Sequence, residues 1–313
     1  MLKRILIVLL LVQAAAALGV ALAARRAWGL DWWAALAIGV GAVLALRLLI
    51  SLHNFYLSWR AGSAVPPAFR LSPLGWLRLV LYEFHASLAA SSLHMLHGTA
   101  PHVVAGGTQP PVLLLHGYAC NSGYWTQLSA RLRQAGISHL APDLEPLGAD
   151  IDHYVAQVHA SVAQLCAAAG AQRVVIVAHS MGGLVARAYL RRHGHARVAR
   201  VITLGTPHHG TALASWGLGR NAAQMRRGSS WLRVLDAADA NSQRDMMTSI
   251  YSHHDNIVAP QDSSQLAGAR HVAVGAIGHV ALGRHPAILR QVLAEIAAVP
   301  LAARRVDSPG QLR

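Results

Sequence analysis

The chain has 313 residues, 54% of them hydrophobic and 13% charged, so it can bury one large core and still carry an apolar accessory segment. Its net charge of +14 comes almost entirely from arginine, an excess that a codon bias would also produce. No nucleic-acid-binding signature accompanies it, so we expect a membrane partner and no nucleic acid, and two cysteines exclude a disulfide framework.

Two apolar runs open the chain. Residues 5–24 contain no charged side chain, and about 20 apolar residues suffice to cross the hydrocarbon core of a membrane as a helix. The second run, about residues 33–52, carries Arg47 near its far end and has aromatic side chains on both sides. Residues 1–60 are therefore predicted to form a transmembrane helical hairpin in the cell inner membrane.

Two other interpretations of this segment stay open. Residues 21–23 fit a signal-peptide cleavage pattern, although the apolar stretch is long for that role. Arg47 shortens the second run, so a single span followed by an interfacial helix is the second alternative. By the distribution of basic residues, a hairpin places the rest of the chain in the cytoplasm, whereas a single span places it in the periplasm.

Residues 61–110 are predicted to be a connector that contains an amphipathic helix over residues 75–97. From residue 111 to 300, short β-prone runs alternate with helical patterns, which predicts a mostly parallel sheet with helices on both faces. Residues 301–313 are expected to be a flexible tail. The expected strands are 112–116, 139–142, 174–178, 198–204, 247–252 and 271–274, and the expected helices are 124–135, 151–169, 181–193 and 286–297.

A serine between a strand and a helix is the first candidate for chemistry. Ala178-His-Ser180-Met-Gly182 follows a buried-type strand directly and has small residues two positions to either side of the serine. This pattern is typical of a nucleophile elbow, in which a cramped turn presents the serine hydroxyl at the top of the sheet. Ser180 is therefore predicted to be the nucleophile; the alternative is an ordinary N-capping serine.

An acyl-transfer site also needs two backbone N–H groups directed at the developing oxyanion. Leu113-Leu-Leu-His116-Gly-Tyr118 ends another strand, and Met181 begins the helix after the serine. The amides of Tyr118 and Met181 are the predicted oxyanion donors. His116 is expected to hold the loop.

The two remaining members of a catalytic triad should follow in the order acid, then histidine. Asp255 follows the strand predicted at 247–252, and His279 follows the strand predicted at 271–274. Asp262 and His285 are the nearby competitors, but Asp262 lies further beyond its strand and His285 precedes Pro286 at a helix start. In this scheme His279 takes the Ser180 proton and Asp255 orients the imidazole.

These motifs resemble those of bacterial triacylglycerol lipases and esterases, and the last third is most similar to the small Bacillus-type lipases. The resemblance implies an α/β-hydrolase fold, a lipid or ester substrate, and no cofactor or metal. The hairpin and the insertion at residues 212–245 depart from the small lipases, and the position of the insertion suits a cap or lid over the site. His179, His208, His209 and Val280 are predicted to line the pocket.

Three functions are compatible with this pattern. The leading hypothesis is a membrane-anchored esterase or lipase (a carboxylic ester hydrolase) that works through an acyl-enzyme. An acyltransferase or thioesterase would use the same triad, since only the leaving group and the acceptor differ. A catalytically silent membrane scaffold is the third alternative, because a fold and a motif do not by themselves establish activity.

Overall fold

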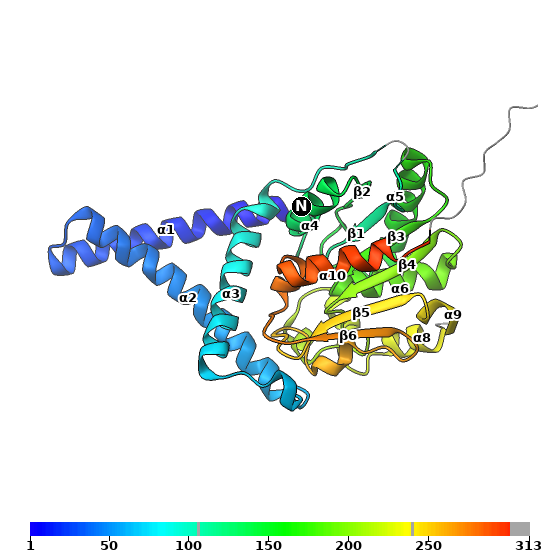
Figure 1. Cartoon of the computed structure of the whole chain (residues 1–313). Coiled ribbons are helices and arrows are strands. Elements are labelled where there is room, and N and C mark those ends of the chain that lie inside the picture. Colours follow the sequence, from blue (N-terminus) through cyan, green and yellow to red (C-terminus); the bar gives the residue numbers. More distant parts are fainter. Residues whose placement is uncertain (105–106, 239–240, 301–313) are drawn as a thin grey trace, which may run out of the picture.

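The computed structural model describes residues 1–104, 107–238 and 241–300, so the predicted tail lies outside the described residues. A twisted sheet covered by helices forms one side of the molecule, and a long helical hairpin projects from it (Figure 1). A third long helix runs across the base of the hairpin (Figure 1).

The sheet has six parallel strands in the order β2-β1-β3-β4-β5-β6, with β3 and β4 at its centre. All six predicted strands are present within two residues of their predicted ends, which confirms the parallel α/β architecture. The strands are β1 Val112–Leu115, β2 His139–Leu140, β3 Val174–His179, β4 Val198–Leu204, β5 Met247–Ser252 and β6 Arg270–Val274.

Helices cover both faces of the sheet because its central strands are apolar on both sides. Along β3, Val174 and Ile176 pack toward α5 and α6, whereas Val175 and Val177 pack toward α4 and α10. The helices of this domain are α4 Thr126–Gln134, α5 Tyr154–Ala169, α6 Met181–His193, α7 Arg220–Gln224, α8 Ser230–Ala238, α9 Asn241–Arg244 and α10 Pro286–Ala297. Short 3₁₀ turns are η3 Ser122–Trp125, η4 Ile151–His153, η5 Ala212–Trp216, η6 Gln261–Ser264 and η7 Val280–Gly283.

The hairpin consists of α1 Leu2–Trp28 and α2 Trp32–Arg60, both longer than the predicted apolar runs. Gly29 ends α1 in the left-handed conformation that favours glycine, and Asp31 begins α2 by accepting hydrogen bonds from the amides of Trp33 and Ala34. By length and composition, both helices could cross a membrane.

Small residues allow α1 and α2 to pack closely. A Cβ atom added to Gly39 would lie 2.0 Å from the carbonyl oxygen of Ala17, and Ala21 and Ala35 are fully buried between the helices. Small residues often line the contacts between apolar helices in lipid. The lipid is as apolar as the helices, so no hydrophobic driving force brings the helices together, and close packing has to do so. The two hairpin helices are therefore held together by close packing of their backbones.

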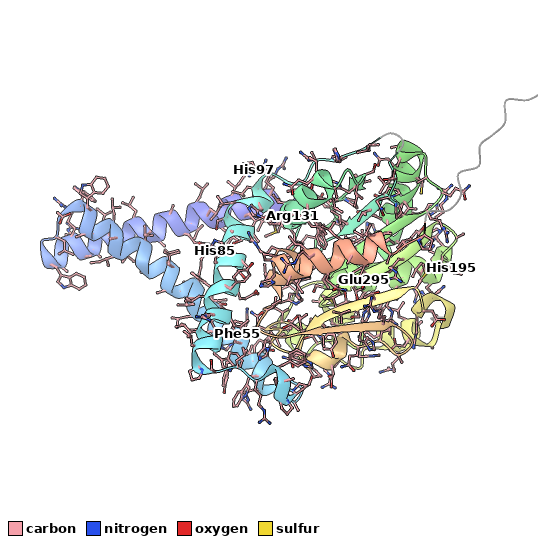
Figure 2. All side chains as sticks on the ribbon, in the orientation of Figure 1. Phe55, His85, His97, Arg131, His195 and Glu295 are labelled. Atoms are coloured by element: carbon pink, nitrogen blue, oxygen red, sulfur yellow. The ribbon has the colours of Figure 1, made fainter. Side chains whose placement is uncertain are left out.

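The connector helix α3 Pro73–Ser92 has two distinct faces. Leu79, Glu83, Ala86 and Ala90 are buried at helical spacing, which places one face on the rest of the protein. The opposite face exposes large apolar side chains, including Leu77. The connector also contains η1 Pro67–Phe69 and η2 His94–Leu96. Phe55 of α2 lies where the hairpin meets α3 (Figure 2), with its ring 6.3 Å from that of Trp76 in an edge-on contact.

We predict that Gly39→Leu separates the two hairpin helices, because its side chain has no space against Ala17. We expect a loss of roughly 1–3 kcal/mol of stability, as for other overpacked sites. Gly41→Leu is the matched control, since nothing lies within 4 Å of a Cβ added there. Thermal unfolding of the detergent-solubilised variants measures both; equal melting temperatures would contradict the close packing.

Candidate active site

Ser180 lies at a sharp turn between β3 and α6, as the elbow motif predicts. Its backbone has φ 54° and ψ −124°, and its amide donates to the carbonyl oxygen of Leu204 at 2.9 Å. A non-glycine residue at such a positive φ is strained, and such strain gathers at functional sites. A Cβ added to Gly182 would lie 2.4 Å from the Leu115 carbonyl oxygen, so the helix can approach the sheet only with glycine there.

Asp255 and His279 lie together beyond the ends of β5 and β6. The Nδ1 atom of His279 is 2.7 Å from Oδ2 of Asp255, and both side chains are buried. The other carboxylate oxygen accepts the amides of Ile257 and Val258 at 2.8 and 2.7 Å. The carboxylate is therefore fixed by three hydrogen bonds and can orient the imidazole.

The competing acid and histidine have other partners. Asp262 lies at the surface, where its amide donates to the hydroxyl of Ser63. His285 caps α10 by accepting the amide of Ala287. The structure thus brings Asp255 and His279 together and leaves Asp262 and His285 outside the pair.

The electrostatic surroundings make His279 a stronger base than an ordinary histidine. Burial by itself lowers the pKa of His279, but the adjacent Asp255 carboxylate outweighs it and the pKa is raised above 6.5. Burial instead holds the pKa of the neighbouring His179 well below that value, so His179 is neutral. Within the described chain, no hydrogen bond joins the Ser180 hydroxyl to His279; such bonds often tighten only when substrate binds.

The predicted oxyanion donors flank the serine. Gly117 lies so close to it that an added Cβ would be 2.9 Å from Cβ of Ser180, and the next residue, Tyr118, lines one cavity together with Ser180. Met181 is the first residue of α6, a position whose amide has no partner within the helix. As expected, His116 holds the loop, since its Nε2 accepts the amide of Leu144 at 2.9 Å.

A cavity of about 390 Å³ opens above Ser180. This volume is typical of pockets that bind small molecules. One wall comes from η5 and from Met225, which directly follows α7, and the other comes from the last turns of the hairpin helix α2. The lining residues are His53, Asn54, Leu57, Tyr118, Ser180, Pro207, Thr211, Leu213, Ala214, Trp216, Gly217, Met225, Ile257 and Val258.

None of the four residues predicted to line the pocket is among those that line this cavity, so the prediction of these residues is corrected. The turn directs Ser180 outward, and the preceding His179 points into the core, where it stacks on Tyr124 at 4.3 Å. His208 is fully buried, and His209 lies 3.4 Å from Asp236. Val280 lines a separate cavity of about 210 Å³ between α2 and α3.

Two residues of the N-terminal helices that the sequence did not single out contact the acid and histidine loops. The hydroxyl of Ser58 in α2 donates to the carbonyl oxygen of Asp255 at 2.6 Å. The carboxylate of Glu83 in α3 accepts backbone amides directly after His279. Ser58 carries no sequence signal, but Glu83 is the only acidic residue between Asp31 and Asp143.

The insertion at residues 212–245 is tied to the oxyanion loop. The hydroxyl of Tyr118 donates to the carbonyl oxygen of Leu218 at 2.8 Å and accepts the amide of Leu218 at 3.0 Å. Leu218 and Trp216 are exposed beside the cavity, with 82% and 79% of their surface accessible. Residues 239 and 240 of the insertion lie outside the described part, and its movement as a lid remains a prediction.

Comparison with known proteins agrees with the fold. Residues 110–227 match a family described as the alpha/beta hydrolase fold. A triacylglycerol lipase of Burkholderia plantarii is 30% identical over 151 residues, covering 44% of this chain and 42% of the lipase. A non-heme haloperoxidase of Rhodococcus erythropolis is 35% identical over 107 residues, covering 32% of this chain and 38% of that protein. The matches thus span about two fifths of these relatives.

A crystal structure of a Bacillus licheniformis lipase in its mature form superposes with a TM-score of 0.56 at 18% identity, covering 62% of this chain and 94% of the lipase. The part of the chain that contains the six-stranded sheet therefore has an α/β-hydrolase fold. The chain is also similar to bacterial triacylglycerol lipases, which confirms the resemblance seen in its motifs.

We predict that Asp255→Asn lowers the pKa of His279, because the largest effect that opposes burial of the imidazolium is then removed. Asp262→Asn is the control. The Asp262 carboxylate lies away from the pair, so its removal should not change the pKa of His279. NMR titration of isotope-labelled histidine in the full-length protein measures both. A His279 pKa unchanged by Asp255→Asn would show that the contact at 2.7 Å does not control the imidazole.

Proposed function

We propose that this protein is a membrane-anchored serine hydrolase that cleaves carboxylic esters of lipid-like substrates. The observation that carries the proposal is the cavity above Ser180, because an apolar hairpin helix and the η5 segment form its walls. An ester with an acyl chain suits a cavity whose lining is mostly apolar and includes Ser180. The similarity to triacylglycerol lipases supports the same substrate class.

In the proposed reaction, His279 removes the proton from the Ser180 hydroxyl as the oxygen attacks the ester carbonyl. Asp255 holds the imidazole through its Nδ1 and stabilises the imidazolium. The amides of Tyr118 and Met181 bind the oxyanion of the tetrahedral intermediate. His279 then protonates the leaving alcohol, and water activated by the same imidazole releases the acid from the acyl-enzyme.

The proposed anchor is the hairpin of residues 1–60 in the cell inner membrane, with residues 61–110 as connector and residues 111–300 as catalytic domain. Exposed tryptophans at the tip support insertion, since Trp33 has 83% of its surface accessible. Both ends of the hairpin contact the catalytic domain: the Met1 ammonium pairs with Glu145, and Ser58 bonds to Asp255. This arrangement supports a hairpin over a single span and, with the basic flanks, a cytoplasmic catalytic domain.

Covalent labelling tests the proposal directly. We expect the full-length protein in detergent to react with a fluorophosphonate probe and to hydrolyse nitrophenyl esters. Ser180→Ala and His279→Ala should each abolish labelling and lower hydrolysis by at least about 10³-fold, because triad members act as a unit. Hydrolysis of wild type should rise with pH through an apparent pKa above 6.5, since His279 must be neutral to act as a base.

An unlabelled but folded wild type would reject the enzyme assignment. Equal hydrolysis by Ser180→Ala would reject this serine as the nucleophile. Turnover of thioesters, or transfer to alcohol acceptors faster than to water, would favour the thioesterase or acyltransferase alternative.

We predict that Leu57→Trp restricts the acyl chains that the enzyme accepts, because Leu57 lines the cavity from α2. Activity toward long-chain nitrophenyl esters should fall about tenfold, and activity toward the acetate should change little. Leu52→Trp is the control on the same helix, as Leu52 is exposed and is not among the cavity-lining residues. A chain-length profile equal to that of wild type would show that α2 does not limit the acyl site.

A further inference from the structure

A second buried carboxylate lies behind the candidate catalytic histidine. Glu83 belongs to α3, outside the strands and helices of the hydrolase fold, and only 1% of its surface is accessible. Its Oε1 accepts the amide of Val280 and its Oε2 accepts the amide of Ala281, each at 2.9 Å. Both oxygens thus bind the two residues that directly follow His279.

The chain around His279 is shaped to fit this carboxylate. A Cβ added to Gly278 would lie 2.5 Å from Cδ of Glu83, so only glycine fits before the histidine. The amide of His279 itself donates to Oδ1 of Asn256 at 2.9 Å. Three successive backbone amides are therefore held by side chains, two of them by Glu83.

The position of Glu83 has an electrostatic consequence as well. Burial raises the pKa of Glu83 to about 7, and the two amides and His279 oppose that rise. The ionised carboxylate in turn raises the pKa of His279, in addition to the larger effect of Asp255. Other titratable groups close to this pair are His179 at the end of β3, Tyr124 in η3 and Tyr82 in α3. Arg47 of α2 lines the same cavity as Glu83.

A purely mechanical clamp would not need a carboxylate. Burying an ionisable group costs free energy, and a neutral acceptor avoids that cost. The charge is useful where a positive charge develops next to it, and in the proposed mechanism that place is the His279 imidazolium.

We propose that Glu83 is a positioning residue for His279: it fixes the histidine loop through two amides, and its charge stabilises the imidazolium. This inference rests on the proposed serine hydrolase function. It makes the connector helix α3 part of the active-site support, so that catalysis depends on how α3 is docked.

The sign of the expected change follows from the charge. Without the carboxylate, the protonated form of His279 is less stable, so its pKa falls and the acid limb of the rate profile moves to lower pH. The rate at the plateau also falls, because the imidazolium forms in the transition state. The two groups titrate as a coupled pair, so the profile reports apparent values.

The test compares Glu83→Gln with wild type in hydrolysis of nitrophenyl butyrate by the full-length protein in detergent. We expect kcat to fall about tenfold with little change in KM, and the acid limb of kcat/KM to move to lower pH. Glu295→Gln is the matched control: Glu295 is a buried carboxylate on α10 (Figure 2) that pairs with Arg200 and Arg270, away from His279. It should lower the melting temperature and leave the acid limb in place.

A folded Glu83→Gln with the wild-type rate and acid limb would overturn the proposal. If Glu83→Gln does not fold, Glu83→Asp tests the proposal in its place. This variant keeps the charge, but its side chain is one methylene too short to reach both amides. For Glu83→Asp the proposal requires a lower kcat and an acid limb of kcat/KM at the wild-type pH. A wild-type kcat for this variant would overturn the proposal. Failure of the proposed function would look different, because wild type itself would not hydrolyse the ester.

Discussion

The buried contact between Asp255 and His279 is the interaction on which the rest of the site depends. A carboxylate can stay buried only if its charge and lone pairs are matched, and the Asp255 carboxylate has three partners, one of which is the imidazole of His279. The amides of Ile257 and Val258 bind the acid, and Asn256 binds the histidine backbone. The loops after β5 and β6 therefore form one polar unit at the edge of the sheet, and the elbow at Ser180 is directed toward it.

The N-terminal helices contribute to this unit as well as to the proposed anchor. Ser58 of α2 binds the acid loop and Glu83 of α3 binds the histidine loop, while Leu57 lines the cavity between them. In this protein the apolar hairpin and the catalytic loops share contacts, so the position of one constrains the other.

Most of the fold could be predicted because it is encoded in local patterns. Alternation of apolar strands and helices located β3, β4 and β5, and the small residues around Ser180 indicated the turn. Chain order and strand ends were enough to pair Asp255 with His279. The pocket was not predictable in this way, because its walls come from segments more than 100 residues apart, and proximity in sequence wrongly suggested His179 and His208. The role of Glu83 was also hidden, since helical periodicity does not show which loop a buried side chain meets.

The paired hydrogen bonds between the Tyr118 hydroxyl and the backbone of Leu218 link two parts of the site that are usually considered separately. Tyr118 carries its main-chain amide next to Ser180 and its side chain under the insertion. A displacement of the insertion at Leu218 must either break both bonds or pull on the loop that presents the amide. In the proposed mechanism, where the Tyr118 amide binds the oxyanion, the position of the insertion and the alignment of that amide are thus mechanically coupled.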